Sequence, residues 1–372
     1  MTIIKNCCSF FKNNVVLAIA IIATIITCVL VPIDNQYLNY FDYKTLTCLF
    51  CILAVVCALK NINFFYILAC KIIQYCKNLR TSIIVLVYIT FIGSMLIAND
   101  MALLTFLPLG YFVLSTTNNK KYMAFTFIMQ NIAANLGGML TPFGNPQNLY
   151  IYNKFNIPNS EFIAIMFPPF IVSIVLITIC CLFIKPKKLK LINENVDFNI
   201  KKAIIYFILF TLSIVIVFRI IPYWIGLIII PISMFFLDKK ALKNVDYPLL
   251  FTFVFFFIFA GNMARIEIIQ NFFSTYLEKN TLLFSILSCQ FISNVPSAIL
   301  LSQFTNNYPD LLLGVNIGGT GTLIASLASL ITFREYIKYN PSKTKYYIVL
   351  YSIFNFGFLI LLTLITTILT SL

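Results

Sequence analysis

Two stretches of the chain place glycine, amide and hydroxyl residues inside otherwise apolar sequence. Residues 134–151 read ANLGGMLTPFGNPQNLYI, and residues 315–332 read VNIGGTGTLIASLASLIT. Aligned without a gap, they share an Asn, a Gly-Gly pair, a Thr and small polar residues in register. Such side chains supply neutral hydrogen-bond donors and acceptors, and glycine lets the backbone approach a ligand closely. The two copies therefore predict a binding site built from two related halves.

A second pair of motifs lies upstream of these stretches. LIANDMALLTFLPL (96–109) precedes the first copy, and FISNVPSAILLSQF (291–304) precedes the second. In this alignment Asn99 corresponds to Asn294, Ala98 to Ser293, and Asp100 to Val295. Each motif interrupts an apolar run at its asparagine, so each half contains two interrupted apolar segments.

The length of the second upstream motif indicates how it enters a membrane. Only about 14 residues, or about 21 Å of helix, separate Lys279 from Asn294, which is short for a membrane crossing. We therefore predict a re-entrant helical hairpin over about 281–305 with its tip at Ser293 and Asn294. The repeat predicts a matching hairpin over about 81–117, although that segment is long enough for two full spans.

The interrupted segments have a physical consequence. Unpaired backbone groups in hydrocarbon cost several kcal/mol, so broken helices occur only against protein or a water-filled cavity. Broken helices over about 122–152 and 311–333 would present helix ends to such a cavity. The glycines that we expect to permit these breaks are Gly137, Gly138, Gly318, Gly319 and Gly321. Glycine and small polar residues also mediate ordinary helix packing in membranes, but two registered copies favour a site.

We expect neutral side chains of both halves to contact the solute. The predicted contacts are Asn99, Asn145, Asn148, Ser293, Asn294, Thr322 and Ser326, and Gln147 belongs to the same polar group. Asp100 is the one acidic residue that we place deep in the membrane, where carboxylates usually serve ion or proton traffic. The alternative is that Asp100 caps a backbone N–H at the hairpin tip.

The composition of the chain is typical of a membrane protein. Of its 372 residues, 60% are hydrophobic and 10% are charged, against about 25% charged in soluble domains. Apolar runs such as 15–32, 161–184, 203–218 and 346–369 have the length of a membrane-spanning helix. We predict an all-α polytopic membrane protein with about nine transmembrane helices plus the two hairpins. The first run is long for a signal peptide, and we expect a retained helix rather than a cleaved leader.

The net charge of +14 reflects basic residues in the loops, which indicate membrane topology and not nucleic-acid binding. Most basic residues fall in short loops that can all lie on one side, which the positive-inside rule places in the cytoplasm together with the N-terminus. This pattern predicts two oppositely oriented halves in the cytoplasmic membrane. The first covers residues 1–190, a linker and extra span cover 191–222, and the second covers 223–372.

Enzymatic chemistry has little support in the sequence. The chain has no histidine, which removes the commonest general base and zinc ligand. Cys48 and Cys51 form a single CxxC in an apolar run, typical of small packing residues rather than a metal site. No P-loop is present, so ATP coupling would need another subunit.

These motifs resemble the ion transporter superfamily, which includes citrate-transporter-like permeases, arsenical-pump membrane proteins, sodium/proton antiporters and divalent anion:sodium symporters. The motifs that carry the resemblance are NDMALLTFLPL, ANLGGMLTPFGNPQNL, SNVPSAILLSQF and GVNIGGTGTLIASLASL. The resemblance covers essentially the whole chain. It implies an elevator-type secondary carrier, commonly a homodimer, whose hairpins and broken helices form the transport domain.

The resemblance also implies roles for particular residues. In the dicarboxylate branch, a Ser-Asn-Thr at each hairpin tip contacts substrate carboxylates and helps bind sodium. This chain has Ala98-Asn99-Asp100 and Ser293-Asn294-Val295, so both asparagines and one serine match and neither threonine does. The Asn-Asp pair is more similar to the arsenical-pump and citrate/proton branches. Carbonyls of the broken helices complete the cation sites in the sodium-coupled branch, and the matching positions here are Gly144-Asn145 and Ala325-Ser326, which the resemblance makes cation or substrate contacts. We expect the coupling ion at Asp100, Asn99, Asn294, Gly144 and Ala325.

We therefore predict a secondary active transporter of a small anionic solute, a carboxylate or oxyanion, driven by H+ or Na+. Its expected partners are the lipid bilayer, the solute and a second copy of the chain, without nucleic acid and without a cofactor other than the coupling ion. The main alternative is a cation/proton antiporter in which Asp100 carries the exchanged ion. A channel is a further alternative, because a polar cavity alone does not require alternating access.

Overall fold

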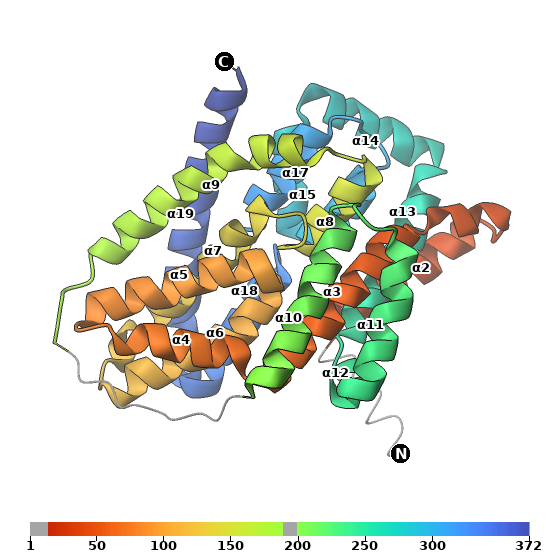
Figure 1. Cartoon of the computed structure of the whole chain (residues 1–372). Coiled ribbons are helices and arrows are strands. Elements are labelled where there is room, and N and C mark those ends of the chain that lie inside the picture. Colours follow the sequence, from red (N-terminus) through yellow and green to blue (C-terminus); the bar gives the residue numbers. More distant parts are fainter. Residues whose placement is uncertain (1–13, 189–198, 372) are drawn as a thin grey trace, which may run out of the picture.

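The computed structural model describes residues 14–188 and 199–371, and within these ranges the chain folds into helices joined by short connections (Figure 1). Six of these helices are long and apolar enough to cross a membrane. They are α3 (Tyr43–Asn61), α5 (Leu79–Ile97), α9 (Asn159–Leu182), α10 (Ile200–Val217), α13 (Tyr247–Ala264) and α19 (Thr344–Ser371). The predicted all-α membrane fold is confirmed.

The remaining helices are shorter. Those of eight residues or more are α2 (Val15–Leu30), α4 (Phe64–Gln74), α6 (Asn99–Thr116), α7 (Met123–Gly137), α8 (Pro146–Lys154), α11 (Tyr223–Leu237), α14 (Glu267–Lys279), α15 (Thr281–Ile292), α16 (Asn294–Leu301), α17 (Tyr308–Ile317) and α18 (Leu327–Tyr339). The elements of six residues or fewer are η1 (Asn35–Tyr40), η2 (Lys120–Tyr122), η3 (Gly138–Leu140), α12 (Lys239–Lys243) and η4 (Pro341–Lys343).

Polar side chains fix where several helices begin. The carboxylates of Asp42 and Asp246 accept the backbone N–H of Thr45 and Leu249, each at 3.0 Å, at the starts of α3 and α13. Asn78 caps α5 in the same way. A side chain that accepts one of the first free N–H groups stabilises a helix start by about 1 kcal/mol. These caps therefore help to define where the apolar helices begin.

Two helical hairpins lie where the sequence motifs predicted interruptions. Only Ala98 separates α5 from α6, and only Ser293 separates α15 from α16. The second hairpin is short, with helices of 12 and 8 residues, whereas α5 has 19 residues and is itself long enough to cross a membrane. The two hairpins therefore differ in the length of their arms, although their tips lie at aligned positions of the repeat.

Two interrupted helices accompany the hairpins. The first runs from α7 through η3 into α8, and the second runs from α17 into α18. Residues 138–145 and 318–326 form the breaks. The second interrupted helix continues to Tyr339, beyond residue 333 where we expected it to end.

The hairpins and interrupted helices of the two halves pack into one another. α6 packs against α18, and α16 packs against α8, so each hairpin contacts the interrupted helix of the other half. A second group of helices, in which α3 packs against α10, α11 and α12, lies beside them, and α13 packs against α2 (Figure 1). The predicted boundary near residue 190 lies outside the described residues, and the division into halves at that point stays a prediction.

Candidate functional site

The two hairpin tips share one unusual backbone conformation. Ala98 has φ 66° and ψ 150°, and Ser293 has φ 74° and ψ 157°. This region is populated almost only by glycine, and a residue with a Cβ held there costs about 1–3 kcal/mol. The strain falls on the two positions that the repeat aligns, directly before the asparagines that begin α6 and α16.

Each tip is tied to the break of its own half by matching hydrogen bonds. The backbone N–H of Asn99 donates to the carbonyl of Gly144 at 3.1 Å, and that of Asn294 donates to the carbonyl of Ala325 at 2.9 Å. Each asparagine also turns its side-chain oxygen back onto the next backbone N–H, at 2.9 Å in both halves. These bonds satisfy one of the first N–H groups of each helix. Within the described residues, no side-chain cap hydrogen bond is found at the start of α6, so the capping role considered for Asp100 has no hydrogen bond to support it.

The threonines of the repeat hold the breaks against the first arms of the hairpins. Thr141 Oγ1 donates to the carbonyl of Met95 at 2.8 Å, and Thr322 Oγ1 donates to the carbonyl of Gln290 at 3.0 Å. Thr322 was predicted as a solute contact, but its hydroxyl and its N–H are both bonded to Gln290. These two bonds hold Thr322 at the break, and its contact with the solute stays a prediction.

Two amide side chains satisfy the carbonyl groups that the breaks expose. Asn148 Nδ2 lies within 3.2–3.3 Å of the carbonyl oxygens of Gly138, Met139 and Thr141. Gln290 Nε2 donates to the carbonyls of Gly318 and Thr320 at 2.9 and 3.2 Å. Sequence analysis missed Gln290, because its counterpart in the first half is Met95 and the repeat gives no signal at that position.

Glycine is required at the breaks for two different reasons. A Cβ on Gly137 would lie 2.3 Å from the carbonyl oxygen of Phe91, so this glycine allows α7 to approach the first hairpin. Gly321 has φ +113°, a conformation that side-chain-bearing residues rarely adopt. The other predicted glycines, Gly138, Gly318 and Gly319, also have neighbouring atoms within 3.1 Å of a built Cβ.

A buried amide network joins the two halves. Asn135 Nδ2 donates to Ser326 Oγ at 3.1 Å, and at the equivalent position Asn145 Nδ2 donates to Asn316 Oδ1 at 3.2 Å. Asn316 in turn donates to Asn148 Oδ1 at 2.6 Å. Asn145, Asn148 and Ser326 are each no more than 1% exposed. These three predicted solute contacts therefore lie within the network that fastens the halves together.

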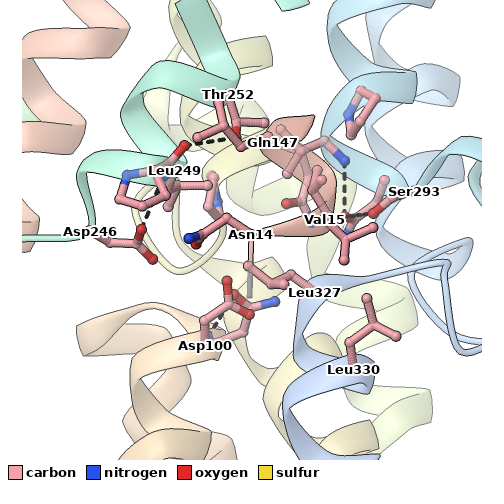
Figure 2. Close-up of a pocket in the computed structure, with 18 of the residues that line it drawn as sticks. Asn14, Val15, Asp100, Gln147, Asp246, Leu249, Thr252, Ser293, Leu327 and Leu330 are labelled. Carbon is pink, nitrogen blue, oxygen red and sulfur yellow. Dashed lines mark hydrogen bonds between the residues drawn. The ribbon is translucent and has the colours of Figure 1, made fainter. Parts of the chain in front are cut away.

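A pocket of about 90 Å³ lies between the hairpin tips (Figure 2). This volume exceeds several times the roughly 10–15 Å³ that one water molecule needs. The first residues of five helices line it: Val15 of α2, Asn99 of α6, Pro146 of α8, Asn294 of α16 and Leu327 of α18. Helix N-termini carry partial positive charge, so their convergence favours an anion.

Charged groups from three elements also line this pocket. Asp100 lies in the first turn of α6, Asp246 precedes α13, and Arg334 lies on α18. Neither Asp246 nor Arg334 was singled out as a site residue from the sequence. Their position depends on how α13 and α18 pack against the hairpins.

The predicted site residues thus divide into two sets. Asn99, Asp100, Ser293 and Asn294 line the pocket. The carbonyls of Gly144 and Ala325 lie directly behind the tips, where they accept the N–H groups of the two asparagines. Asn145, Asn148, Thr322 and Ser326 stabilise the breaks and the join between the halves. The binding functions of all of these residues stay predictions.

Paired hairpins and interrupted helices that meet at a polar pocket are typical of the transport site of a secondary transporter. A family model described as citrate transporter matches residues 3–309. The chain belongs to this family, which makes it a membrane transporter rather than an enzyme. The matched range contains both hairpin tips and the first break, and it ends before the second break.

Two relatives agree with this assignment. The chain is 35% identical over 301 residues to a protein named uncharacterized transporter MJ0456 of Methanocaldococcus jannaschii, covering 80% of this chain and 82% of that protein. It is 29% identical over 308 residues to inner membrane protein YbiR of Escherichia coli K12, covering 79% and 80% respectively. The predicted resemblance to the superfamily is confirmed, and the chain is a multi-pass membrane protein.

Proposed function

We propose that this transporter is a secondary active carrier of a small anionic solute, a carboxylate or oxyanion, coupled to H+ or Na+. The observation that carries the proposal is the pocket lined by the N-termini of five helices, among them the four that begin at the hairpin tips and after the breaks. Each such end attracts an anion with a free energy of about 0.3–1 kcal/mol at an exposed site and more when partly buried. These helix ends attract a ligand of negative charge, and the carboxylate of Asp100 in the first turn of α6 opposes that attraction until it is neutralised.

The tip residues have the chemistry to orient that ligand. Ser293 provides a hydroxyl, and the asparagines bring amide groups to the wall of the pocket. Asn99 Nδ2 donates to Asn135 Oδ1 at 3.1 Å, which holds its side chain in place. We expect Ser293, Asn99 and Asn294 to contact the solute.

The carboxylates of the pocket account for coupling. Asp100 and Asp246 repel an anion, by about 4 kcal/mol for a unit charge at 4 Å in a medium of effective dielectric constant 20. An anion binds well only after a proton or a cation has neutralised this charge. Binding of the two ions is therefore linked, as symport requires.

Uptake into proteoliposomes tests the proposal. Citrate, succinate, phosphate, sulfate and arsenite would be offered to the reconstituted full chain, with and without a Na+ gradient and with and without a pH gradient. We expect saturable counterflow of one solute class, and Asn294→Ala to raise its KM by about tenfold, or about 1.4 kcal/mol. Asn199→Ala, which removes the cap of α10, is the matched control and should leave KM unchanged. Flux that does not saturate would indicate a channel instead.

A cation/proton antiporter is the second candidate, and the two carboxylates in one pocket favour it. In an antiporter, an outward Na+ gradient would drive proton entry without any added anion. A pH-sensitive dye inside the vesicles separates the two functions. Proton entry that requires a transported anion supports the carrier, and entry in anion-free buffer supports the antiporter.

The elevator motion, the homodimer and the orientation belong to the same proposal. We expect the hairpins and interrupted helices to move together, because α6 packs on α18 and α16 packs on α8. We expect the N-terminus to face the cytoplasm and the protein to reside in the cytoplasmic membrane, as the loop charges indicate. Labelling of single cysteines in the loops of intact cells would test this orientation.

A further inference from the structure

Two buried tyrosines lie one turn apart on α19 and differ in the hydrogen bonds of their hydroxyl groups. The hydroxyl of Tyr351 donates to Ser329 Oγ at 2.8 Å and lies 3.3 Å from the carbonyl oxygen of Thr322. The hydroxyl of Tyr347 is buried and has no hydrogen-bond partner among the described residues. Both side chains are at most 1% exposed. Tyr351 therefore makes a hydrogen bond with the second interrupted helix that its neighbour on α19 does not make.

The hydrogen bond of Tyr351 continues through the start of α18. Ser326 directly precedes α18, and its Oγ lies 2.9 Å from Ser329 Oγ and accepts the Ser329 N–H at 3.2 Å. From α7, Asn135 Nδ2 donates to Ser326 Oγ at 3.1 Å. Tyr351 is thus connected through two serines to an asparagine of the first half.

The connection ends at the tip of the first hairpin. Asn135 Oδ1 accepts from Asn99 Nδ2 at 3.1 Å, and Asn99 lines the pocket. Every side chain from Tyr351 to Asn99 is no more than 4% exposed, so water hardly competes for these bonds. α7 packs against α6, α18 and α19, which holds the participating helices together. We call this series of side chains, Tyr351, Ser329, Ser326, Asn135 and Asn99, the hydrogen-bond relay.

The relay fixes the orientation of the amide group of Asn99. Its Nδ2 donates to Asn135 Oδ1, and its Oδ1 accepts the backbone N–H of Asp100 at 2.9 Å. A flipped amide would place oxygen against oxygen at Asn135 and N–H against N–H at Asp100, so both bonds would be lost. An asparagine amide has two N–H groups and two acceptor sites on its oxygen. These two bonds therefore leave one N–H and one acceptor site of Asn99 for a solute.

The tyrosine at the far end of the relay is a feature of the second half. α9, the last helix of the first half, contains no tyrosine, whereas α19 contains Tyr351. The two hairpin tips have the same backbone conformation, but the relay connects the last helix of the chain to the first tip. We propose that Tyr351 is a positioning residue, whose hydroxyl orients the amide of Asn99 in the pocket through the relay.

The relay has a consequence for solute binding. Without the hydroxyl of Tyr351, the serines at the start of α18 and the amide of Asn135 lose an anchor and can exchange partners. The amide of Asn99 then meets the solute in a mixture of orientations, so the solute binds more weakly, whereas the elements that move during transport are unchanged. This consequence rests on the proposed transport activity, but the relay itself does not.

Melting temperatures of the purified full-length protein in detergent test the relay without any solute. Tyr351→Phe removes one oxygen atom and keeps the ring, and Asn99→Ala removes the other end of the relay. Residues of one hydrogen-bond network are coupled, whereas distant residues without shared partners contribute additively. We expect the double variant to lose at least about 2 °C less than the sum of the two single losses. Tyr347→Phe with Asn99→Ala is the matched control and should be additive, because the hydroxyl of Tyr347 has no partner in the described part of the chain.

A second variant keeps the test independent of how well Tyr351→Phe folds. Ser329→Ala interrupts the relay at α18 and gives a second cycle with Asn99→Ala. This double variant should also lose less than the sum of its single losses. Additive losses in these cycles would overturn the proposal.

Counterflow in proteoliposomes tests the consequence for the solute, with citrate, succinate, phosphate and sulfate as probes. For a transported probe, Tyr351→Phe should raise KM about threefold to tenfold and leave the maximal rate nearly unchanged. It should have no further effect on KM in the Asn99→Ala background, and Tyr347→Phe should change neither quantity. An unchanged KM in Tyr351→Phe, or an increase that persists in the Asn99→Ala background, would overturn the proposal. Coupled melting temperatures in a protein that takes up no probe would refute the transport proposal and leave the relay standing.

Discussion

Asn145 and Asn316 fasten the two halves of the molecule to each other across 171 residues of sequence: Asn145 Nδ2 donates to Asn316 Oδ1 at 3.2 Å, and both residues are 1% exposed. Asn316 Nδ2 also donates to Asn148 Oδ1 at 2.6 Å. The amides that the repeat singled out thus include groups that assemble the pocket as well as groups that line it.

Asn316→Ala should strongly destabilise the protein. The change leaves Asn145 Nδ2 and Asn148 Oδ1 without a partner from Asn316, and each unsatisfied buried group costs about 1–3 kcal/mol. We expect a loss of about 2–4 kcal/mol, measured by denaturant unfolding in detergent. Asn61→Ala, at an exposed asparagine, should change stability by less than about 0.5 kcal/mol. Equal losses in the two variants would contradict the structural function of the network.

Glycine at the hairpin tips should stabilise the fold. Ala98→Gly and Ser293→Gly would relieve about 1–3 kcal/mol of backbone strain, offset by about 0.5–1 kcal/mol of added chain entropy. We expect a net gain of about 1 kcal/mol from melting temperatures. Ala102→Gly, in the regular part of α6, should instead cost about 1 kcal/mol. If the tip variants lose stability as Ala102→Gly does, the tips are not strained.

Gly137→Ala should disrupt the contact between α7 and the first hairpin. The added Cβ would lie 2.3 Å from the backbone oxygen of Phe91, which cannot move without shifting α5. Such overpacking costs about 1–3 kcal/mol. Gly357→Ala is the matched control, because nothing lies within 4 Å of a Cβ at that position of α19, and it should be neutral or stabilising. Unfolding measurements on the two variants would separate steric conflict from a general intolerance of alanine.

Asp100→Asn should uncouple transport. The amide retains the shape of the side chain but removes the charge that a proton or cation neutralises. We expect solute uptake to lose its dependence on the coupling-ion gradient and to become equilibrative, so that counterflow continues while accumulation stops. Glu267→Gln, at the start of α14 and outside the pocket, should still accumulate solute. Full gradient-driven accumulation by Asp100→Asn would remove Asp100 from the mechanism.

The Asp34–Arg265 pair should give stability with a defined pH dependence. Arg265 donates to both carboxylate oxygens, at 3.1 and 2.7 Å, and lowers the pKa of Asp34 below its ordinary value. A lowered folded-state pKa stabilises the protein above the unfolded pKa of about 3.9 and loses this effect as pH falls through the folded value.

Arg265→Gln should therefore lower the melting temperature slightly at neutral pH, and the difference from the wild type should decline as pH falls below about 4 and vanish below the lowered folded-state pKa of Asp34. The effect is small because both side chains are solvent-exposed. Lys338→Gln, which removes the surface pair with Glu335, serves as the comparison. A difference that persists undiminished in acid would show that Arg265 acts through packing rather than charge.

The features that could be predicted from the sequence are those that occur in both of its halves. The alignment of Asn99 with Asn294 and of Gly144 with Ala325 anticipated that tips and breaks correspond, and the structure gives each pair the same hydrogen bond. Periodicity and apolar length were sufficient for the helices, because bilayer thickness and backbone satisfaction restrict the chain to a few arrangements.

Features that depend on three-dimensional packing escaped prediction. Asp246 and Arg334 reach the pocket only because α13 and α18 pack beside the hairpin tips, and no local pattern marks either residue. Asn148 and Ser326 have the same chemistry as the tip residues, so composition could not separate residues that line the pocket from residues that hold it together. The number of spans was also uncertain from sequence, because α5 is a hairpin arm with the length of a full crossing.

The reciprocal packing of α6 on α18 and of α16 on α8 sets an order of events during biosynthesis. Asn131 and Asn135 meet Ser329 and Ser326, which are 198 and 191 residues further along. At a synthesis rate of about 5–20 residues per second, the first half waits about 10–40 s for these partners. Until then Asn131 and Asn135 lack these partners, so the first half cannot complete its polar network before the second half has been synthesised.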